Sequence, residues 1–598
     1  MKYRPLLISL VFLVFFNVRA IAQRESLGLE SLGEFGFTPA DPQAKLGLEY
    51  IFAGRGFRLF VPDELFTKLI TFDRRRQWVV YGNAPSPRSR AFGGDDTSGK
   101  DVGLSYASME KDGDRYISFT CFQCHAGLVA GRLIAGVGNA HIDQYALLQD
   151  LSEFKKVLDF YERRTGLGKA LIDLVGELSD EKKEHLRYFS LYSETILRPA
   201  LKGASARGDD YGPFPVWQLM ARMKDPSKTG FDVHDFDDST SELKKREALV
   251  SRIPLGPVDR RPWWLRKHDT KSYVYGDTLA LPHAGKDFAI NFTVPHKGHN
   301  ETYAERSREI SQILEFALRT EAPRYPRFAK LNAAKIDAGA SIYDSRCSRC
   351  HGKYAPNPSD THHRWVLKYR SLEYQGANPQ WKGKHLPDVL YSTGVDPEWT
   401  ENTDETYSRA LQWWGGTNPD THQPTGQGLT GYVAGIRDFF AGPPYSISVE
   451  NLPAVYNPRL PGYRAPPLVG IWASAPYLHN GSVPTLKDLF EYYEVEKGES
   501  LRPPVWAHVV DATEAGSYDF AGYGLVVEFP KDWKMPKKPD APFDHVESTN
   551  YRLFYDTSQV GKSNKGAVTC GPNLKDKREK DAVLEFLLSL SDETVRPE

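Results

Sequence analysis

Apolar residues recur with helical spacing in one stretch of the C-terminal half of the chain, residues 331–343. Ile336, Gly339 and Tyr343 follow the i, i+3, i+7 pattern that places side chains on one face of a helix. The pattern predicts a helix with Gly339 on its packed face. A glycine there favours close contact with a second helix, and the alternative is a neutral glycine that costs a little helix stability.

A second amphipathic pattern occupies residues 576–590, near the C-terminus. It predicts a helix with one polar face and one apolar stripe that packs on the protein core. The stripe consists of Val583, Leu584, Leu587 and Leu588.

The N-terminal half has a weaker pattern. Helical spacing is visible in residues 145–162, less cleanly in 179–197, and again in 307–318. Residues 203–241 are rich in Gly, Pro, Asp and Ser, which predicts a loop. Because strand alternation is rare, we expect a mainly α fold with long loops, in which small β elements are possible.

The first residues of the chain have the pattern of an export signal. Met1–Arg4 is basic, Leu6–Val18 is largely apolar, and Ala20–Ala22 fits an A-x-A cleavage site. We therefore expect a signal peptide at residues 1–22, a periplasmic or secreted protein, and no membrane span after cleavage. An uncleaved anchor is the alternative, although the apolar run is short for a span.

Composition excludes some classes of partner. Of the 598 residues, 26% are charged, and the formal net charge is -1. Because no basic excess is present, we expect neither a nucleic acid nor an anionic lipid surface as partner.

Two C-x-x-C-H motifs, at residues 121–125 and 347–351, carry the most specific chemistry in the chain. This spacing lets two thiols form thioethers to one porphyrin while the adjacent histidine binds the iron. A thiol redox pair or half of a zinc site does not account for a histidine directly after the second cysteine in both copies. The motifs predict two covalently attached haem c groups, held by Cys121, Cys124, His125, Cys347, Cys350 and His351. His125 and His351 are the predicted iron ligands.

The motifs also divide the chain. Pro323 and Pro326 suit a linker, so we expect an N-terminal haem c domain with loop-rich insertions over 23–325. A C-terminal cytochrome c-like domain follows over 326–598, because a helix precedes its C-x-x-C-H motif and another helix ends the chain. Cys570 is the one cysteine outside the motifs.

Several segments resemble a known family. The stretch 464–486 closely resembles a signature of large exported diheme c-type cytochromes, the superfamily of diheme cytochrome c peroxidases and rubber oxygenases. Residues 138–143, 262–264, 275–277 and 285–288 are also similar to that group. The resemblance implies two cytochrome c-like haem domains and an oxidoreductase, but it does not distinguish a peroxidase from an oxygenase or an electron carrier.

The resemblance also suggests roles for a few further residues. It implies that His479 lies beside the second haem, where it would hydrogen-bond a propionate or shape the haem edge; a loop histidine bonded to backbone carbonyls is the alternative. Trp263 and Trp264 either pack near a haem as part of an electron path or are ordinary core residues.

The sixth ligand of each iron is left open. In many resembling proteins a histidine ends the run that here is 561–567, but Ala567 stands in its place. For the second haem, the remaining candidates are Cys570, Met535, His508 and His545. For the first haem, His141 or Met109 could approach the iron, and otherwise its face is open.

Two functions remain. One is an exported diheme oxidoreductase in which one haem activates peroxide or oxygen and the other relays electrons, with a redox partner protein or a small-molecule oxidant as partner. The other is a non-catalytic diheme electron-transfer protein. Neither the substrate nor the catalytic residues can be inferred from the sequence.

Overall fold

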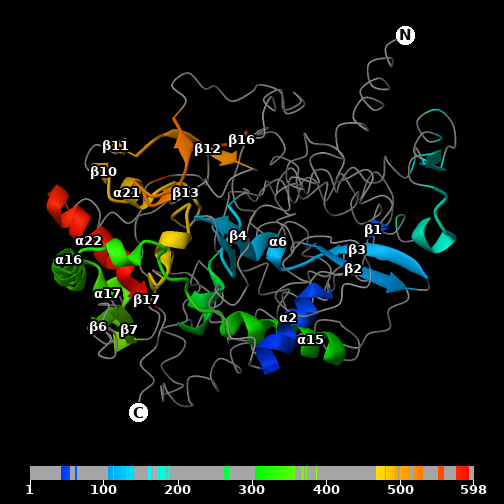
Figure 1. Cartoon of the computed structure of the whole chain (residues 1–598), viewed down its shortest axis with the longest axis horizontal. Coiled ribbons are helices and arrows are strands. Elements are labelled where there is room, and N and C mark those ends of the chain that lie inside the picture. Colours follow the sequence, from blue (N-terminus) through cyan, green and yellow to red (C-terminus); the bar gives the residue numbers. More distant parts are fainter. Residues whose placement is uncertain are drawn as a thin grey trace, which may run out of the picture.

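The computed structural model describes the chain in separate stretches (Figure 1). They comprise residues 42–53, 61–62, 106–111, 113–130, 132–140, 159, 161–162, 166, 169, 172–173, 176–183, 186, 261–268, 303–356, 365–369, 372–373, 385–386, 466–478, 480–491, 493–494, 499–500, 502–511, 518–529, 550–557, 564, 574 and 576–591. The expected signal peptide lies outside these residues.

Helices α16 (Ala333–Arg346) and α22 (Lys577–Ser589) pack against each other and frame the second motif. Gly339 faces α22 so closely that a Cβ atom at this position would collide with the carbonyl oxygen of Ala582. The prediction that Gly339 makes a close helix contact is therefore confirmed. Both helices begin with a side-chain cap, because Asn332 and Asp576 accept hydrogen bonds from backbone N–H groups of the first turn.

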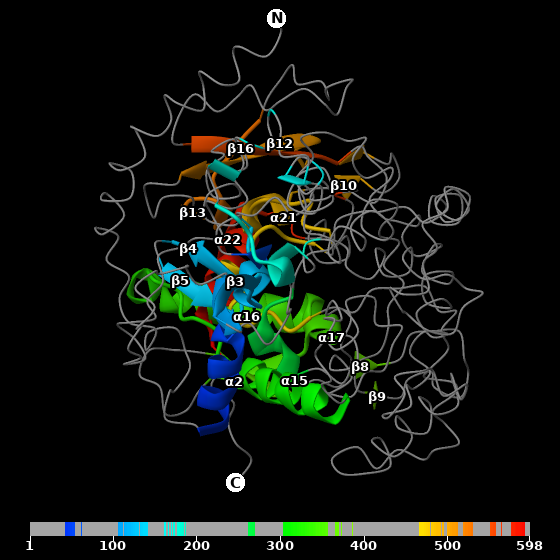
Figure 2. The ribbon, with the colours of Figure 1, turned by 90° about the vertical axis from the view of Figure 1, so that its right-hand side faces the viewer.

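Helices α2 (Pro42–Phe52) and α15 (Tyr303–Leu318) form a second pair, which lies side by side in both views (Figures 1 and 2). Gly47 makes the close contact here, and a Cβ atom on it would collide with the carbonyl oxygen of Gln312. Phe316 lies one turn after Gln312, just as Phe586 lies one turn after Ala582. The two pairs thus share a crossing built from a glycine and a phenylalanine.

Each motif forms a single helical turn, α6 (Phe122–His125) or α17 (Ser348–His351). After α6 the chain enters the hairpin of β4 (Ala126–Val129) and β5 (Arg132–Ala135). After α17 it turns at Gly352, whose φ of 89° suits a glycine.

Small sheets complete the fold. β12 (Val505–Asp511) is the central strand of a sheet with β15 (Val527–Glu528) and β16 (Asn550–Asp556), and it pairs antiparallel with both. A hairpin of β2 (Tyr106–Lys111) and β3 (Asp114–Phe119) leads into the first motif, with β1 (Val61–Pro62) beside β3.

The remaining elements are short. They are η7 (Trp263–His268), η8 (Phe328–Lys330), β6 (Lys353–Pro356), β7 (Trp365–Tyr369), β8 (Leu372–Glu373), β9 (His385–Leu386), η10 (Ile471–Ala473), α21 (Leu486–Leu489), β10 (Tyr493–Glu494), β11 (Glu499–Ser500), β13 (Tyr518–Asp519), β14 (Gly524–Leu525) and β17 (Leu590–Ser591).

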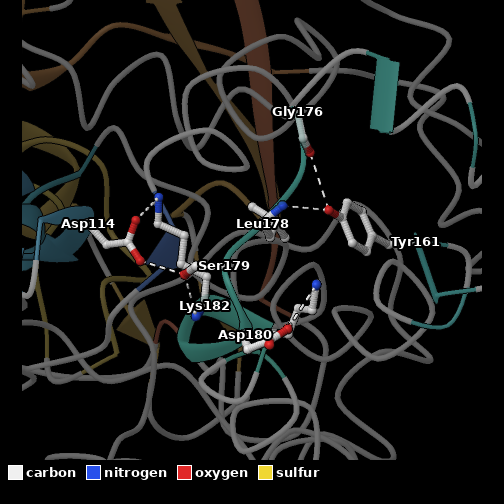
Figure 3. A network of polar contacts seen from close by, with 8 residues as sticks. Asp114, Tyr161, Gly176, Leu178, Ser179, Asp180 and Lys182 are labelled. Carbon is white, nitrogen blue, oxygen red and sulfur yellow. Dashed lines mark hydrogen bonds and ion pairs between the residues drawn. The ribbon is translucent and has the colours of Figure 1, made fainter.

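A polar network holds the tip of the β2–β3 hairpin (Figure 3). The carboxylate of Asp114 forms an ion pair of 3.0 Å with the ammonium group of Lys182 and accepts a hydrogen bond of 2.5 Å from the hydroxyl of Ser179. The hydroxyl of Tyr161 accepts a hydrogen bond of 2.7 Å from the backbone N–H of Leu178. The network therefore ties the segment around residue 180 to the hairpin that leads into the first motif.

The predicted helices can be compared with these elements. The helix expected at 576–590 is confirmed as α22, and its apolar stripe is buried. The helix at 331–343 begins two residues later and ends at Arg346, while the helix at 307–318 begins earlier, at Tyr303. Of residues 145–162, positions 159, 161 and 162 are described, and all three are helical. Within the described residues, no helix is both long and apolar enough to span a membrane.

Candidate haem centres

Both C-x-x-C-H motifs have the same backbone geometry. The N–H of His125 donates to the carbonyl of Cys121, and the N–H of His351 donates to the carbonyl of Cys347, each over 3.0 Å. One helical turn therefore brings the first cysteine and the histidine of each motif to the same face. Among the described residues, Cys121, Cys124 and Cys347 form no disulfide bond.

The imidazole of His351 is oriented by the backbone. Its Nδ1 atom lies 2.7 Å from the carbonyl oxygen of Pro466. Because a carbonyl only accepts hydrogen bonds, Nδ1 carries the proton and the lone pair is on Nε2. A metal-binding histidine usually has this arrangement, which fixes the ring and raises its basicity. The carbonyl of Pro466 thus fixes the orientation of the His351 ring in the second motif.

The imidazole of His125 instead lies against an indole. The ring centroids of His125 and Trp263 are 5.0 Å apart, with an angle of 30° between the planes. The backbone also connects the two residues, because the N–H of Gly136 donates to the carbonyl of His125 and the N–H of Trp263 donates to the carbonyl of Gly136. At Gly136 φ is 86°, and a Cβ atom would lie 3.1 Å from that of Trp263. These contacts therefore hold the indole of Trp263 against the first motif.

One segment, residues 466–473, contacts the second motif and also Trp264, the neighbour of Trp263, and we call it the junction segment. Pro466 accepts the hydrogen bond from His351, and the N–H of Leu468 donates to the hydroxyl of Tyr354 over 2.8 Å. The carbonyl of Val469 accepts a hydrogen bond of 2.9 Å from the indole N–H of Trp264, which is fully buried. Trp263 and Trp264 are adjacent in sequence. The junction segment therefore connects His351 to the tryptophan that packs on His125.

The residues present fit haem c. Two of the three groups that each motif needs, the first thiol and the imidazole, lie on one turn, and the carbonyl of Pro466 holds Nδ1 of His351. Bound haem would supply electron transfer or, with an open face, binding of oxygen or peroxide. His125 and His351 would hold the iron atoms. The described part of the chain contains no cluster of three His, Cys, Asp or Glu residues for another metal ion.

His479 itself lies outside the described residues, but the turn around it is well defined. Leu478 and Gly481 have φ values of 71° and 70°, and the backbones of Tyr477 and Val483 pair across the turn. The positive φ of Gly481 is a conformation that glycine adopts readily, so this residue permits the tight turn. The haem-edge role of His479 stays a prediction.

An aromatic stack clamps the two sides of that turn. The rings of Trp506 and Tyr555 are parallel, with centroids 5.0 Å apart. The indole N–H of Trp506 donates to the carbonyl of Ser482, and the hydroxyl of Tyr555 donates to the carbonyl of Asn480. All these groups are buried, so strands β12 and β16 hold the turn rigidly.

Of the candidates for the sixth ligand of the second iron, the structure describes His508. It is fully buried on β12, and its Nδ1 atom lies 3.0 Å from the carbonyl oxygen of Val526. Cys570, Met535, His545 and His141 lie outside the described residues, as does the side chain of Met109. The ligation of both irons therefore stays open.

The run that lacks the usual histidine is anchored by a buried arginine. The guanidinium of Arg502 donates to three backbone carbonyls, those of Asp488, Leu489 and Asn564, at 3.2, 2.7 and 2.5 Å. Burial lowers the pKa of Arg502 to about 10, which leaves it protonated at neutral pH. Arg502 thus fixes residue 564, three positions before Ala567.

Sequence reasoning missed Pro466, Val469 and Arg502. Each acts through its backbone or on a backbone group, so residue type gives no signal of the role. The sequence did single out Trp263 and Trp264, and the structure places Trp263 beside the first motif and Trp264 on the junction segment.

Comparison with known proteins identifies the same region. Residues 462–497 match the family model described as RoxA-like, cytochrome c-like. This match includes the junction segment and the turn around residue 479. It relates the segment to cytochrome c-like domains, which bind haem c and carry out redox chemistry.

Two curated relatives come from Sinorhizobium fredii (strain NBRC 101917 / NGR234). Uncharacterized protein y4iM is 36% identical over 118 residues, covering 15% of this chain and 27% of the relative. Uncharacterized protein y4iJ is 29% identical over 181 residues, covering 28% of both. The chain thus spans just over a quarter of the length of each relative.

Proposed function

We propose that this chain is an exported diheme c-type cytochrome that acts as an oxidoreductase. One haem activates peroxide or oxygen, and the other relays electrons from a redox partner. The haems are held in two cytochrome c-like domains, residues 23–325 and 326–598. The similarity of residues 462–497 to a cytochrome c-like family supports the haem chemistry.

The observation that carries the proposal is the continuous connection between the two motifs. It starts at His125, whose ring lies 5.0 Å from Trp263, and continues through the adjacent Trp264 to Val469. The junction segment then leads to Pro466 and His351. Aromatic rings and hydrogen bonds transmit electrons better than gaps do, so this connection suits an intramolecular electron path. A protein with two independent carriers would have no need of it.

The matching helix pairs support two haem domains. In small cytochromes c, a helix before the motif packs on a helix at the end of the domain. Helices α16 and α22 stand in this order around α17, and α2 and α15 stand in this order around α6. Each pair is joined through one glycine, Gly339 or Gly47.

We assign the reactive role to the first haem. Trp263 packs on one side of its histidine, and the sequence of the first domain predicts loop-rich insertions. The second histidine has the carbonyl partner that stabilises a strongly bound iron, which suits the relay role.

Carbon monoxide binding tests the proposal. The reduced holoprotein should change its absorbance spectrum when carbon monoxide is added, because a reactive haem has a vacant or labile position. His125→Ala should alter the spectrum of the carbon monoxide complex, because the reactive iron loses its proximal ligand, and His351→Ala should leave that complex unchanged. If the spectrum of the wild type does not change, the chain is the non-catalytic electron carrier instead.

Trp264→Phe tests the connection. This variant keeps an aromatic ring but removes the donor to Val469, so electron transfer between the two haems should slow in stopped-flow or flash experiments. Trp365→Phe is the matched control, because Trp365 packs on Phe586 and lies outside the connection. Equal transfer rates in the two variants would argue against the path.

A further inference from the structure

A cluster of tyrosine and tryptophan side chains lies beside the junction segment. Trp472 is buried at its end, and its ring centroid is 5.7 Å from that of Tyr325, which precedes α16. Tyr325 is in turn 6.3 Å from Tyr523, which is only half buried. These three rings therefore lead stepwise from the junction segment to the surface.

Hydrogen bonds hold the indole of Trp472 and the backbone of Trp472 and Tyr523 in place. The indole N–H of Trp472 donates to the carbonyl of Pro323 over 2.8 Å, and the hydroxyl of Tyr518 donates to the carbonyl of Trp472 over 2.9 Å. The carbonyl of Tyr523 accepts the hydroxyl of Tyr477 and the N–H of Leu486. Tyr523 itself has a φ of 62°, an uncommon conformation for a tyrosine, so the loop is held firmly by its contacts.

The chemistry of this cluster differs from that of the aromatic cluster at the first motif. There, Phe122 and Phe316 pack on Trp263 and Phe52 packs on Phe122, and phenylalanine cannot be oxidised by biological oxidants. Tyrosine and tryptophan lose one electron readily. Redox-active rings thus continue from the junction segment outward.

Burial sets the protonation state of these phenols. Burial raises the pKa of Tyr325 to about 12, and burial also raises the pKa of Tyr523. Both phenols are therefore neutral at physiological pH and lose their protons only on oxidation. Lys487 and Arg327 lie over the rings of Tyr523 and Phe520, at 6.0 and 3.6 Å from the centroids.

We propose that Trp472, Tyr325 and Tyr523 form a relay that carries electrons one at a time from the surface to the haems. The relay rests on the proposed function, because it needs a haem oxidised by hydrogen peroxide. The O–O bond of peroxide breaks, and two electrons and two protons convert it to two water molecules. Tyr523 and Tyr325 each supply one electron through Trp472 and release the phenolic proton to solvent, leaving neutral phenoxyl radicals.

The relay predicts where radicals appear when holoprotein reacts with hydrogen peroxide in the absence of a reductant. A nitroso spin trap followed by peptide mass spectrometry should place an adduct on Tyr523. In Tyr523→Phe the adduct should move to Tyr325, and in Trp472→Phe the adducts on both tyrosines should be lost. The control Tyr161→Phe, in the distant network of Figure 3, should leave the adduct on Tyr523 unchanged.

Two results would overturn the relay. One is an undiminished adduct on Tyr523 in Trp472→Phe, and the other is the lack of an adduct on wild-type Tyr523 although the haem spectrum responds to peroxide. Because Trp472→Phe also removes the bond to Pro323, Tyr325→Phe is a second variant that retains the ring, and it should equally reduce labelling of Tyr523. Haem content and circular dichroism confirm that each variant is folded.

A second experiment separates the relay from the peroxide chemistry. Haems reduced with dithionite can be oxidised by a photogenerated ruthenium polypyridyl oxidant in solution, without any peroxide. This oxidation should slow in Tyr523→Phe and in Trp472→Phe compared with Tyr161→Phe. Equal rates in all three would refute the relay, whereas slowed rates without any peroxide reaction would retain the relay and refute only the peroxide role.

Discussion

The two motif regions share a helical frame but differ in what surrounds the histidine. In both, a helix pair meets at a glycine, Gly47 or Gly339, and a phenylalanine follows one turn later on the partner helix. Around the first motif the neighbouring rings are phenylalanines and Trp263, whereas around the second they include Tyr343 and Tyr354, whose hydroxyls bond backbone groups. The helix pairs of the two motifs are therefore alike, and the aromatic side chains beside each motif differ.

The largest expected effect concerns the phenylalanine of each pair. Phe316 packs on Phe122 and Trp263, and Phe586 packs on Tyr343 and Trp365. Truncation to alanine should lower the free energy of unfolding by about 3–5 kcal/mol in each case, because a large buried ring leaves a cavity.

The effects should also stay local. In denaturant titrations followed by haem absorbance, Phe316→Ala should loosen the first haem before the second, and Phe586→Ala should do the reverse. Phe529→Ala, at a side chain that is 51% exposed, is the control and should change little. If both haems titrate identically in both variants, the two helix pairs unfold as one unit rather than two.

Substitution of the two glycines should have the next largest effect on the free energy of unfolding. Gly47→Ala or Gly339→Ala places a Cβ atom against the backbone of the facing helix, so the pair must separate. We expect each change to cost up to about 3 kcal/mol in unfolding free energy, the usual range for overpacking. Asp337→Ala, at an exposed position of α16, should stay within about 0.5 kcal/mol in the same thermal unfolding measurement. A harmless Gly47→Ala beside a costly Gly339→Ala would mean that the first pair is looser than the second.

Removal of an ion pair should have a smaller effect on stability, and this effect should differ between the two regions. Lys182, which pairs with Asp114 at the hairpin before the first motif, has a side chain that is only 7% exposed, whereas both Arg346 and Glu579 at the second are 34% exposed. Lys182→Met should therefore cost about 1–2 kcal/mol, because Asp114 loses a charged partner in a partly buried site. Arg346→Met should cost less than about 1 kcal/mol. Chemical denaturation in low and high salt measures both, and a cost that is equal and salt-sensitive in both variants would contradict the distinction.

The smallest effect depends on pH. Hydrogen bonds from Arg578 lower the pKa of the Asp576 carboxyl, which caps α22. The stabilising contribution is therefore present above the ordinary pKa of aspartate and is lost as the pH falls through the lowered value. Asn332, which caps α16, does not titrate. Acid should thus increase hydrogen exchange at the start of α22 more than at the start of α16, and Asp576→Asn should remove that difference.

Sequence periodicity predicted one member of the first helix pair and both members of the second. α15, α16 and α22 carry regular apolar positions, whereas α2 is short and its role depends on the distant Gln312. The motifs were evident because covalent chemistry fixes residue type and spacing. The junction segment was recognisable as a family signature, but its bond from Trp264 to Val469 joins residues 205 positions apart and uses a carbonyl that every residue has. Contacts of this kind leave no pattern in a single sequence.

The position of the closing helices along the chain has a consequence for biosynthesis. The bond from the N–H of Asn332 to the carboxylate of Glu585 spans 253 residues, with the second motif near its beginning. A ribosome makes the chain from the N-terminus, so the thiols of each motif exist before α15 or α22 is available to pack beside them. We expect the attachment machinery to meet open motifs, and the last helix of each pair then to enclose a haem that is already bound.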